Sequence, residues 1–254
     1  MDTQSMSVMD HIVELRRRIV IAFVFFALAF IIGFFLATPL ITYLTNAPMA
    51  QDLPMNAFKL TDPFRIFMTM ATIIAFVMIF PVILYQLWAF VSPGLHENER
   101  KVTLAYIPFA FLLFLGGLAF AYFILFPFII QFMGNLAGRL GITEQYGINE
   151  YFSFLFQITI PMGLLFQLPV VVMFLTRLGL VDPSGLTKFR KYAYFVLLVI
   201  AGFITPPDLM SHLMVTVPLL LLYEFSIWLS RIAYRKVLKA QKLQEEELNR
   251  SEAQ

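Results

Sequence analysis

Three carboxylates near the ends of apolar segments could bind a cationic group. Glu14 lies on the polar side of an apolar stripe with helical spacing, formed by Val8, Ile12, Leu15 and Ile19. Glu97 and Glu99 follow a helix-breaking Ser-Pro-Gly turn at 92–94. A carboxylate holds a guanidinium group by bidentate, charge-assisted hydrogen bonds. One interpretation is that Glu14 and one of the other two acids face a common cytoplasmic groove as a site for a cationic ligand.

The same acids also have a purely local interpretation. On one helix Glu14 is spaced to pair with Arg18 at i+4 or Arg17 at i+3, which contributes about 0.2–0.5 kcal/mol. Glu97 and Glu99 would help to cap the next apolar helix, because the first turn of a helix favours negative charge. The residue types leave both interpretations open.

Rare polar side chains interrupt the apolar segments of the second half of the chain. Burial in lipid is costly for such groups, so each is a functional candidate. For Gln167 the alternative is a neutral hydrogen bond between helices, and for Glu224 an extension toward Arg231. The turn at 205–208 must be covered by protein or reached by water, because it exposes polar backbone below the outer surface. The candidates are Gln157, Gln167, Asp208, His212 and Glu224.

Enzymatic and metal-binding patterns are incomplete in this sequence. The run from His96 to Arg100 begins like the HExxH zinc motif but has Arg where the second His is required. The three histidines, at 11, 96 and 212, are too scattered to suggest a metal cluster, and there is no Cys for thiol chemistry. We therefore predict no enzymatic activity, no cofactor and no metal site.

Apolar segments must position all of these groups. Hydrophobic residues make up 60% of the 254 residues and charged residues 13%, against roughly 45–50% and 25% in soluble domains. A bilayer core about 30 Å thick requires about 20 helical residues. We predict an all-α, polytopic membrane protein with six transmembrane helices, the last two short, in one domain over 1–238, followed by a polar cytoplasmic tail at 239–254. The apolar blocks are 19–37, 66–90, 102–132, 151–178, 192–204 and 213–230.

The basic residues predict the orientation of these helices. Six crossings place both termini on one side, and that side holds every Lys and Arg except Lys59, Arg65 and Arg139. By the positive-inside rule both termini are cytoplasmic. The longer loops, about 38–65 and 134–150, then face outward, and their Pro and Gly residues predict caps or short helices. The net charge of +2 is thus an orientation signal, and we expect no nucleic-acid partner.

Several blocks of the sequence closely resemble the TatC family. The resemblance covers about residues 8–235 in the family's order and spacing. It implies a six-helix membrane protein shaped like a cupped hand, the signal-peptide receptor of the twin-arginine translocase, which exports folded proteins with the protonmotive force. It also implies the cytoplasmic (inner) membrane of a prokaryote. The blocks are HIVELR at 11–16, FPVILYQ at 80–86 with WAF at 88–90, ER at 99–100, AFAYF at 119–123 with FP at 126–127, and TPPD at 205–208.

The resemblance assigns roles to particular residues. Glu14 and Glu99 match the two cytoplasmic acids that bind the paired arginines of the signal peptide, which favours the binding-site interpretation over the local pair. Matched neighbours in that site are Arg16, Phe90 and Pro93. Further positions that the family uses for partner contact or transport are Pro48, Gln167, Thr205, Asp208 and His212.

Two of these positions depart from the family. Many relatives carry Glu where this chain has Gln167, so a titratable proton site is not expected there, although an amide can still bond a partner helix. His212 stands where a relative has Gln, near Thr205, in a polar patch that engages partner subunits. His96 replaces a commonly aromatic residue.

The resemblance implies partners as well. These are twin-arginine signal peptides of folded cargo proteins, the single-span TatA and TatB subunits and membrane lipid, in a hetero-oligomeric complex. The competing class is a secondary transporter of small solutes, which would show inverted repeats and buried charge near the midplane. Here the spans are nearly free of charge and no repeat is visible. A purely structural membrane scaffold is the third class.

Overall fold

Helices form almost all of the described chain, which confirms the all-α prediction. The computed structural model describes residues 8–48, 50, 53, 55–92, 100, 103–205 and 208–252. The elements are α1 (Val8–Thr45), β1 (Met55–Asn56), α2 (Asp62–Val91), α4 (Tyr106–Phe120), the π-helix η2 (Ala121–Leu125), α5 (Phe126–Leu140), β2 (Tyr146–Gly147), α6 (Ile148–Leu165), α7 (Leu168–Arg177), α8 (Pro183–Lys188), α9 (Arg190–Ile204) and α10 (Leu209–Glu252).

Two compact units divide these elements. Unit 1 comprises Met1–Phe111 and Ile130–Phe156, and unit 2 comprises Leu112–Ile129 and Gln157–Gln254. The boundaries between the units fall inside α4, α5 and α6, so each of these three helices has residues in both units. Each unit is described by itself below.

Five segments of the described chain are long and apolar enough to cross a membrane, which confirms a multi-pass membrane protein. With 15 residues, α9 reaches only about 22 Å, as predicted for the fifth block. The expectation that the last helix is short was wrong, because α10 continues as a helix past Arg231 and Arg235, whose long side chains can extend toward a membrane surface. The five segments are His11–Thr45, Asp62–Val91, Tyr106–Leu140, Ile148–Arg177 and Leu209–Lys236.

Helices also extend beyond the predicted apolar blocks. The apolar stripe near the N-terminus is part of α1, which runs unbroken from Val8 to Thr45. Helix α5 continues to Leu140, which shortens the loop predicted at about 134–150. That helix ends at Gly141, where φ is 68° and the Ile142 N–H donates to the Ala137 carbonyl. A glycine in this conformation is a common helix C-cap.

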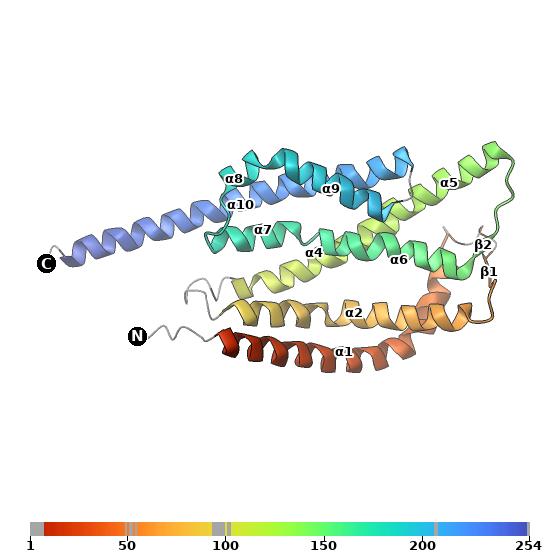
Figure 1. The fold of residues 1–254 in the computed structure, drawn as a ribbon, viewed down its shortest axis with the longest axis horizontal. Coiled ribbons are helices and arrows are strands. Elements are labelled where there is room, and N and C mark those ends of the chain that lie inside the picture. Colours follow the sequence, from red (N-terminus) through yellow and green to blue (C-terminus); the bar gives the residue numbers. More distant parts are fainter. Residues whose placement is uncertain are drawn as a thin grey trace. The chain divides into compact units, whose positions relative to one another are not determined.

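In unit 1, α1 and α2 lie side by side and antiparallel (Figure 1). Small residues permit this close packing: a Cβ at Gly33 would lie 2.5 Å from the backbone oxygen of Ala71. The buried core of the pair contains Ala29, Ala75 and Ile79. The C-terminal end of α2 is thereby held beside the N-terminal turns of α1, where the first candidate acid lies.

The segments that lead into α2 and into α6 are tied together by a short parallel pair of strands. Met55 of β1 pairs with Tyr146 of β2. The buried carboxylate of Asp62, at the start of α2, accepts the backbone N–H groups of Phe58 at 3.1 Å and Lys59 at 2.8 Å. Asp62 therefore fixes the chain that leads from β1 into α2.

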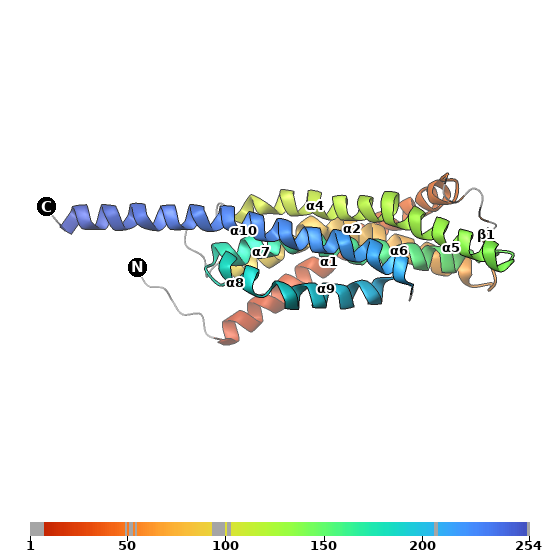
Figure 2. The ribbon, with the colours of Figure 1, turned by 90° about the horizontal axis from the view of Figure 1, so that it is seen from above.

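In unit 2, α10 packs against α7, α8 and α9. The buried hydroxyls of Thr176 and Ser230 lie 2.7 Å apart and link α7 to α10, and the Tyr223 hydroxyl donates to the Leu186 carbonyl of α8 at 2.9 Å. Beyond these contacts α10 continues as one helix past α7 and α8 (Figure 2). The polar tail is thus a helical extension of the last span.

Prolines explain two interruptions in the long helices. The π-helix η2 lies just before Pro127, whose ring would clash with the carbonyl four residues earlier in a regular helix. Helices α6 and α7 are separated at Phe166 and Gln167, just before Pro169. Gln167 becomes the N-cap residue of α7. Proline chemistry thus places one predicted functional residue at a helix break.

Candidate functional site

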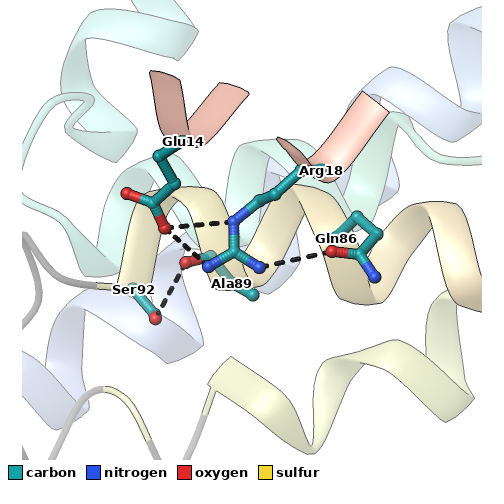
Figure 3. Close-up of polar contacts among 5 residues, drawn as sticks. All are labelled: Glu14, Arg18, Gln86, Ala89 and Ser92. Atoms are coloured by element: carbon teal, nitrogen blue, oxygen red, sulfur yellow. Dashed lines mark hydrogen bonds and ion pairs between the residues drawn. The ribbon is translucent and has the colours of Figure 1, made fainter. Parts of the chain in front are cut away.

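A carboxylate, a guanidinium and an amide meet where α1 and α2 run side by side (Figure 3). Arg18 donates to one oxygen of Glu14, Oε1, through Nη2 at 2.6 Å and Nε at 3.1 Å. Its third donor, Nη1, lies 3.2 Å from Oε1 of Gln86 on α2. The local pair between Glu14 and Arg18 is therefore formed, and Gln86 extends it to the second helix.

The pair borders a pocket of about 530 Å³. Only 19% of the Glu14 side chain and 24% of the Arg18 side chain are exposed. The second carboxylate oxygen of Glu14, Oε2, is buried and has no hydrogen-bond partner among the described residues. An acceptor is thus held next to a cavity by the packing of α1 on α2. The pocket is lined by Val13, Glu14, Arg17, Arg18, Ile21, Tyr85 and Gln86.

Aromatic side chains near the end of α2 contact α1 and the segment that follows α2. The ring of Phe90 lies 4.5 Å from that of His11 on α1, centroid to centroid. The indole N–H of Trp88 donates to the Thr103 hydroxyl at 3.0 Å, and the Arg100 guanidinium lies 5.8 Å from the Trp88 ring. Arg100 stacks by a cation–π interaction, so α2 also positions the residue that follows Glu99.

The remaining predicted receptor residues have different outcomes. Arg16 is exposed on α1, and Phe90 is half-buried. Pro93 and Glu99, like Glu97 and His96, lie outside the described residues. The convergence of Glu14 and Glu99 therefore stays a prediction.

Pro48 lies just beyond the C-terminal end of α1. It is exposed and borders a second pocket of about 560 Å³, together with Pro39 and Tyr43. This pocket is mostly apolar and carries no charged side chain among its lining residues. It offers packing surface rather than a site for a charged ligand.

The turn between α9 and α10 brings three predicted residues close together in sequence and in space. Thr205 is buried, and its hydroxyl donates to the Ala201 carbonyl at 2.9 Å. Asp208 caps α10 by accepting the Ser211 N–H at 2.7 Å. His212 is half-buried and lies over α9, since a Cβ at Gly202 would be 3.3 Å from its ring. These residues give α9 and α10 a polar end at this connection.

Glu224 does not extend toward Arg231 as the sequence suggested. It accepts a hydrogen bond from Arg190 Nη2 at 2.6 Å and another from the Tyr194 hydroxyl at 2.5 Å. Both partners lie on α9, one turn apart, so the carboxylate ties α9 to α10. The side chains of Arg190 and Glu224 are 36% and 38% exposed, which limits the contribution of this pair to stability.

Gln86, Arg190 and Tyr194 were not singled out from the sequence. Gln86 lies one helical turn before Phe90, and that spacing places both on one face of α2. Arg190 and Tyr194 share the same spacing at the start of a short apolar block. Each of these residues acts through a partner on another helix. The local sequence pattern does not indicate that partner.

Five apolar segments of the described chain define a polytopic α-helical membrane protein, in which a carboxylate holds a guanidinium beside a pocket. Comparison with known proteins makes this class specific. The family model for Sec-independent protein translocase protein (TatC) matches residues 10–218. The chain belongs to the TatC family, which confirms the resemblance noted in the sequence.

Individual relatives agree with the family match over nearly full length. The chain is 73% identical to Sec-independent protein translocase protein TatC of Halalkalibacterium halodurans, over 99% of this chain and 100% of the relative. It is 60% identical to TatCy of Bacillus subtilis, over 94% of each chain. A crystal structure described as the twin arginine translocase receptor TatC matches with a TM-score of 0.77 and 31% identity, covering 88% of this chain and 99% of that one.

Proposed function

We propose that this chain is the signal-peptide receptor and core subunit of a twin-arginine translocase. It binds the paired arginines of signal peptides at the cytoplasmic side and exports folded cargo with the protonmotive force, together with single-span TatA and TatB subunits. The proposal draws on the TatC family match and on the name of the similar crystal structure. A secondary transporter of solutes is the alternative, and no observation on this chain favours it.

One observation on the molecule carries the proposal: Glu14 holds a guanidinium group through two N–H donors. The carboxylate therefore already makes the contact that a signal-peptide arginine would require. We propose Glu99 as the second acid, with Arg16, Phe90 and Pro93 as its neighbours in the receptor site. Pro48, Gln167, Thr205, Asp208 and His212 are proposed to serve partner contact or transport.

The proposed topology has six spans in a single domain over 1–238, with α9 as the short fifth span. Both termini then lie in the cytoplasm, and the protein resides in the inner membrane of a prokaryote. The distribution of Lys and Arg supports this orientation. It places the Glu14 pocket on the side from which an exported protein arrives.

Crosslinking tests the proposal directly. A photoreactive amino acid at position 13, and another at position 85, leaves both acids in place beside the Glu14 pocket and is expected to attach to residues next to the paired arginines of a purified twin-arginine signal peptide. The same probe at position 144, in the opposite connection, is the control and should give no such product. Absence of peptide adducts from both position 13 and position 85 would refute the receptor proposal.

The short fifth helix leads to a separate prediction. A helix that covers about 22 Å must thin the bilayer or be shielded by neighbours, and a thinned region would ease passage of folded cargo. Insertion of four Leu after Val199 in α9 is expected to impair transport in membrane vesicles while leaving signal-peptide binding unchanged. Insertion of four Leu after Lys236 in α10, beyond the apolar segment of that helix, serves as the control and should leave transport unchanged. Normal transport by the α9 variant would argue against thinning.

A further inference from the structure

An arginine of the chain itself occupies the position that a ligand arginine would take beside Glu14. Arg18 places Nη2 and Nε at 2.6 and 3.1 Å from Glu14 Oε1, and Nη1 at 3.2 Å from Gln86 Oε1 (Figure 3). One carboxylate oxygen and one amide oxygen together accept three N–H groups of a single planar cation. We define this pair of acceptors, Glu14 and Gln86, as the guanidinium subsite.

The other oxygen of Glu14 does not provide a second place for a ligand. Glu14 Oε2 is buried and has no hydrogen-bond partner in the described part of the chain. A guanidinium that enters from the pocket therefore meets Oε1, and Arg18 already holds that oxygen. Because both cations have the same donor geometry, they compete for the same acceptors.

We propose that Arg18 is an internal competitor that fills the guanidinium subsite in the free receptor and is displaced by an arginine of the signal peptide. This inference rests on the proposed function, which supplies the ligand. Arg18 borders the pocket and its side chain is 24% exposed, so water can solvate its guanidinium after release. The exchange replaces one set of charge-assisted hydrogen bonds by an equivalent set.

With such a competitor, the apparent affinity of the receptor for the signal peptide equals its intrinsic affinity multiplied by the fraction of receptors whose subsite is open. An i, i+4 ion pair with one additional hydrogen bond corresponds to an affinity reduction of about 2- to 10-fold. The same factor applies to every ligand of the subsite, so the competitor leaves the preference for arginine over lysine unchanged. That preference comes from the two acceptors, because a lysine, with a single compact ammonium, lacks the fork of a guanidinium.

The test measures binding of a fluorescent twin-arginine signal peptide to the purified full-length protein in detergent. Arg18→Gln is expected to bind the peptide about 2- to 10-fold more tightly than wild type. Arg17→Gln is the matched control, because Arg17 lines the same pocket but makes no hydrogen bond or ion pair with Glu14 among the described contacts. A gain that Arg17→Gln reproduces in full would reflect net charge alone and overturn the proposal, as would weaker binding by Arg18→Gln.

A second variant series distinguishes a competitor from a residue that merely holds Glu14 in place. Gln86→Leu removes an acceptor from ligand and competitor alike in wild type, but only from the ligand in the Arg18→Gln background. The loss of affinity is therefore expected to be larger in that background, and equal losses would contradict displacement. Arg18→Lys keeps the charge but lacks the fork, so it should bind the peptide more tightly than wild type, although less tightly than Arg18→Gln. It provides the comparison with wild type if Arg18→Gln fails to fold.

The outcomes also separate this inference from the proposed function. If the wild-type protein does not bind the twin-arginine peptide, the receptor proposal itself fails. If wild type binds and none of the Arg18 variants binds more tightly than Arg17→Gln, the receptor proposal stands and the internal competitor is excluded.

Discussion

Replacement of both Glu14 and Glu99 by Gln is expected to weaken binding of a twin-arginine signal peptide by about 10²- to 10⁴-fold. Each charge-assisted hydrogen bond contributes about 1.5–3 kcal/mol, so loss of both acids removes roughly 3–6 kcal/mol, at 1.4 kcal/mol per decade of affinity. Fluorescence anisotropy of a labelled peptide with the purified variant in detergent measures this change. Gln keeps the size and one acceptor oxygen, so the loss reports on the charge.

The control must remove the same charge from the same proposed side of the membrane. Glu246→Gln with Glu247→Gln does so in the C-terminal part of α10 and is expected to leave binding within about 2-fold of wild type. On the helix these positions lie about 15 Å or more beyond Lys236, where the apolar segment ends, and the field of a charge in water is screened within about 8–10 Å. Both double variants should retain helical circular dichroism and a single size-exclusion peak. Wild-type affinity of the Glu14 and Glu99 variant would remove both acids from the site.

The second large effect is expected in the core of unit 2, where two neighbouring glycines of α4 differ in their surroundings. A Cβ at Gly117 would lie 2.9 Å from the Cα of Gly163 and 2.8 Å from the Phe166 ring. Such overpacking typically costs 1–3 kcal/mol. Gly117→Leu is therefore expected to lower the apparent unfolding midpoint by roughly 2–12 °C, using about 2–4 °C per kcal/mol for a chain of this size.

Gly116 provides the matched control, since a Cβ there meets nothing within 4 Å. Gly116→Leu makes the same substitution one residue earlier in the same helix, and its midpoint should stay close to wild type. Heating the detergent-solubilised variants and measuring the remaining monomer by size-exclusion chromatography gives both values. Equal destabilisation of the two variants would show that α4 does not pack through Gly117 as described.

Much of the helical architecture could be predicted from hydropathy because a bilayer imposes its own length on every span. Each of the first four predicted blocks overlaps one of the apolar segments of the structure. The helix ends could not be predicted in this way, since a helix continues through polar residues as long as its backbone hydrogen bonds are formed. The apolar segment of α10 illustrates this. It runs past Arg231 to Lys236, although the sixth block was predicted to end just before Arg231.

The site was only partly predictable. Spacing on one helix indicated the pair of Glu14 with Arg18, which the structure contains. The contribution of Gln86 depends on how α2 lies along α1, 68 residues apart in sequence, and no local pattern encodes that register. For the same reason Glu224 was assigned to a residue on its own helix, whereas its partners Arg190 and Tyr194 lie on α9.

The central claim is that Glu14 and Glu99 together recognise the guanidinium groups of the signal peptide. Its most direct test is the ratio of affinities for a twin-arginine peptide and the same peptide with paired lysines, measured on wild type and on the double Gln variant. Wild type is expected to prefer arginine, because lysine lacks the bidentate fork, and the double variant is expected to lose that preference. An equal preference for arginine in both proteins would show that other residues recognise the arginines.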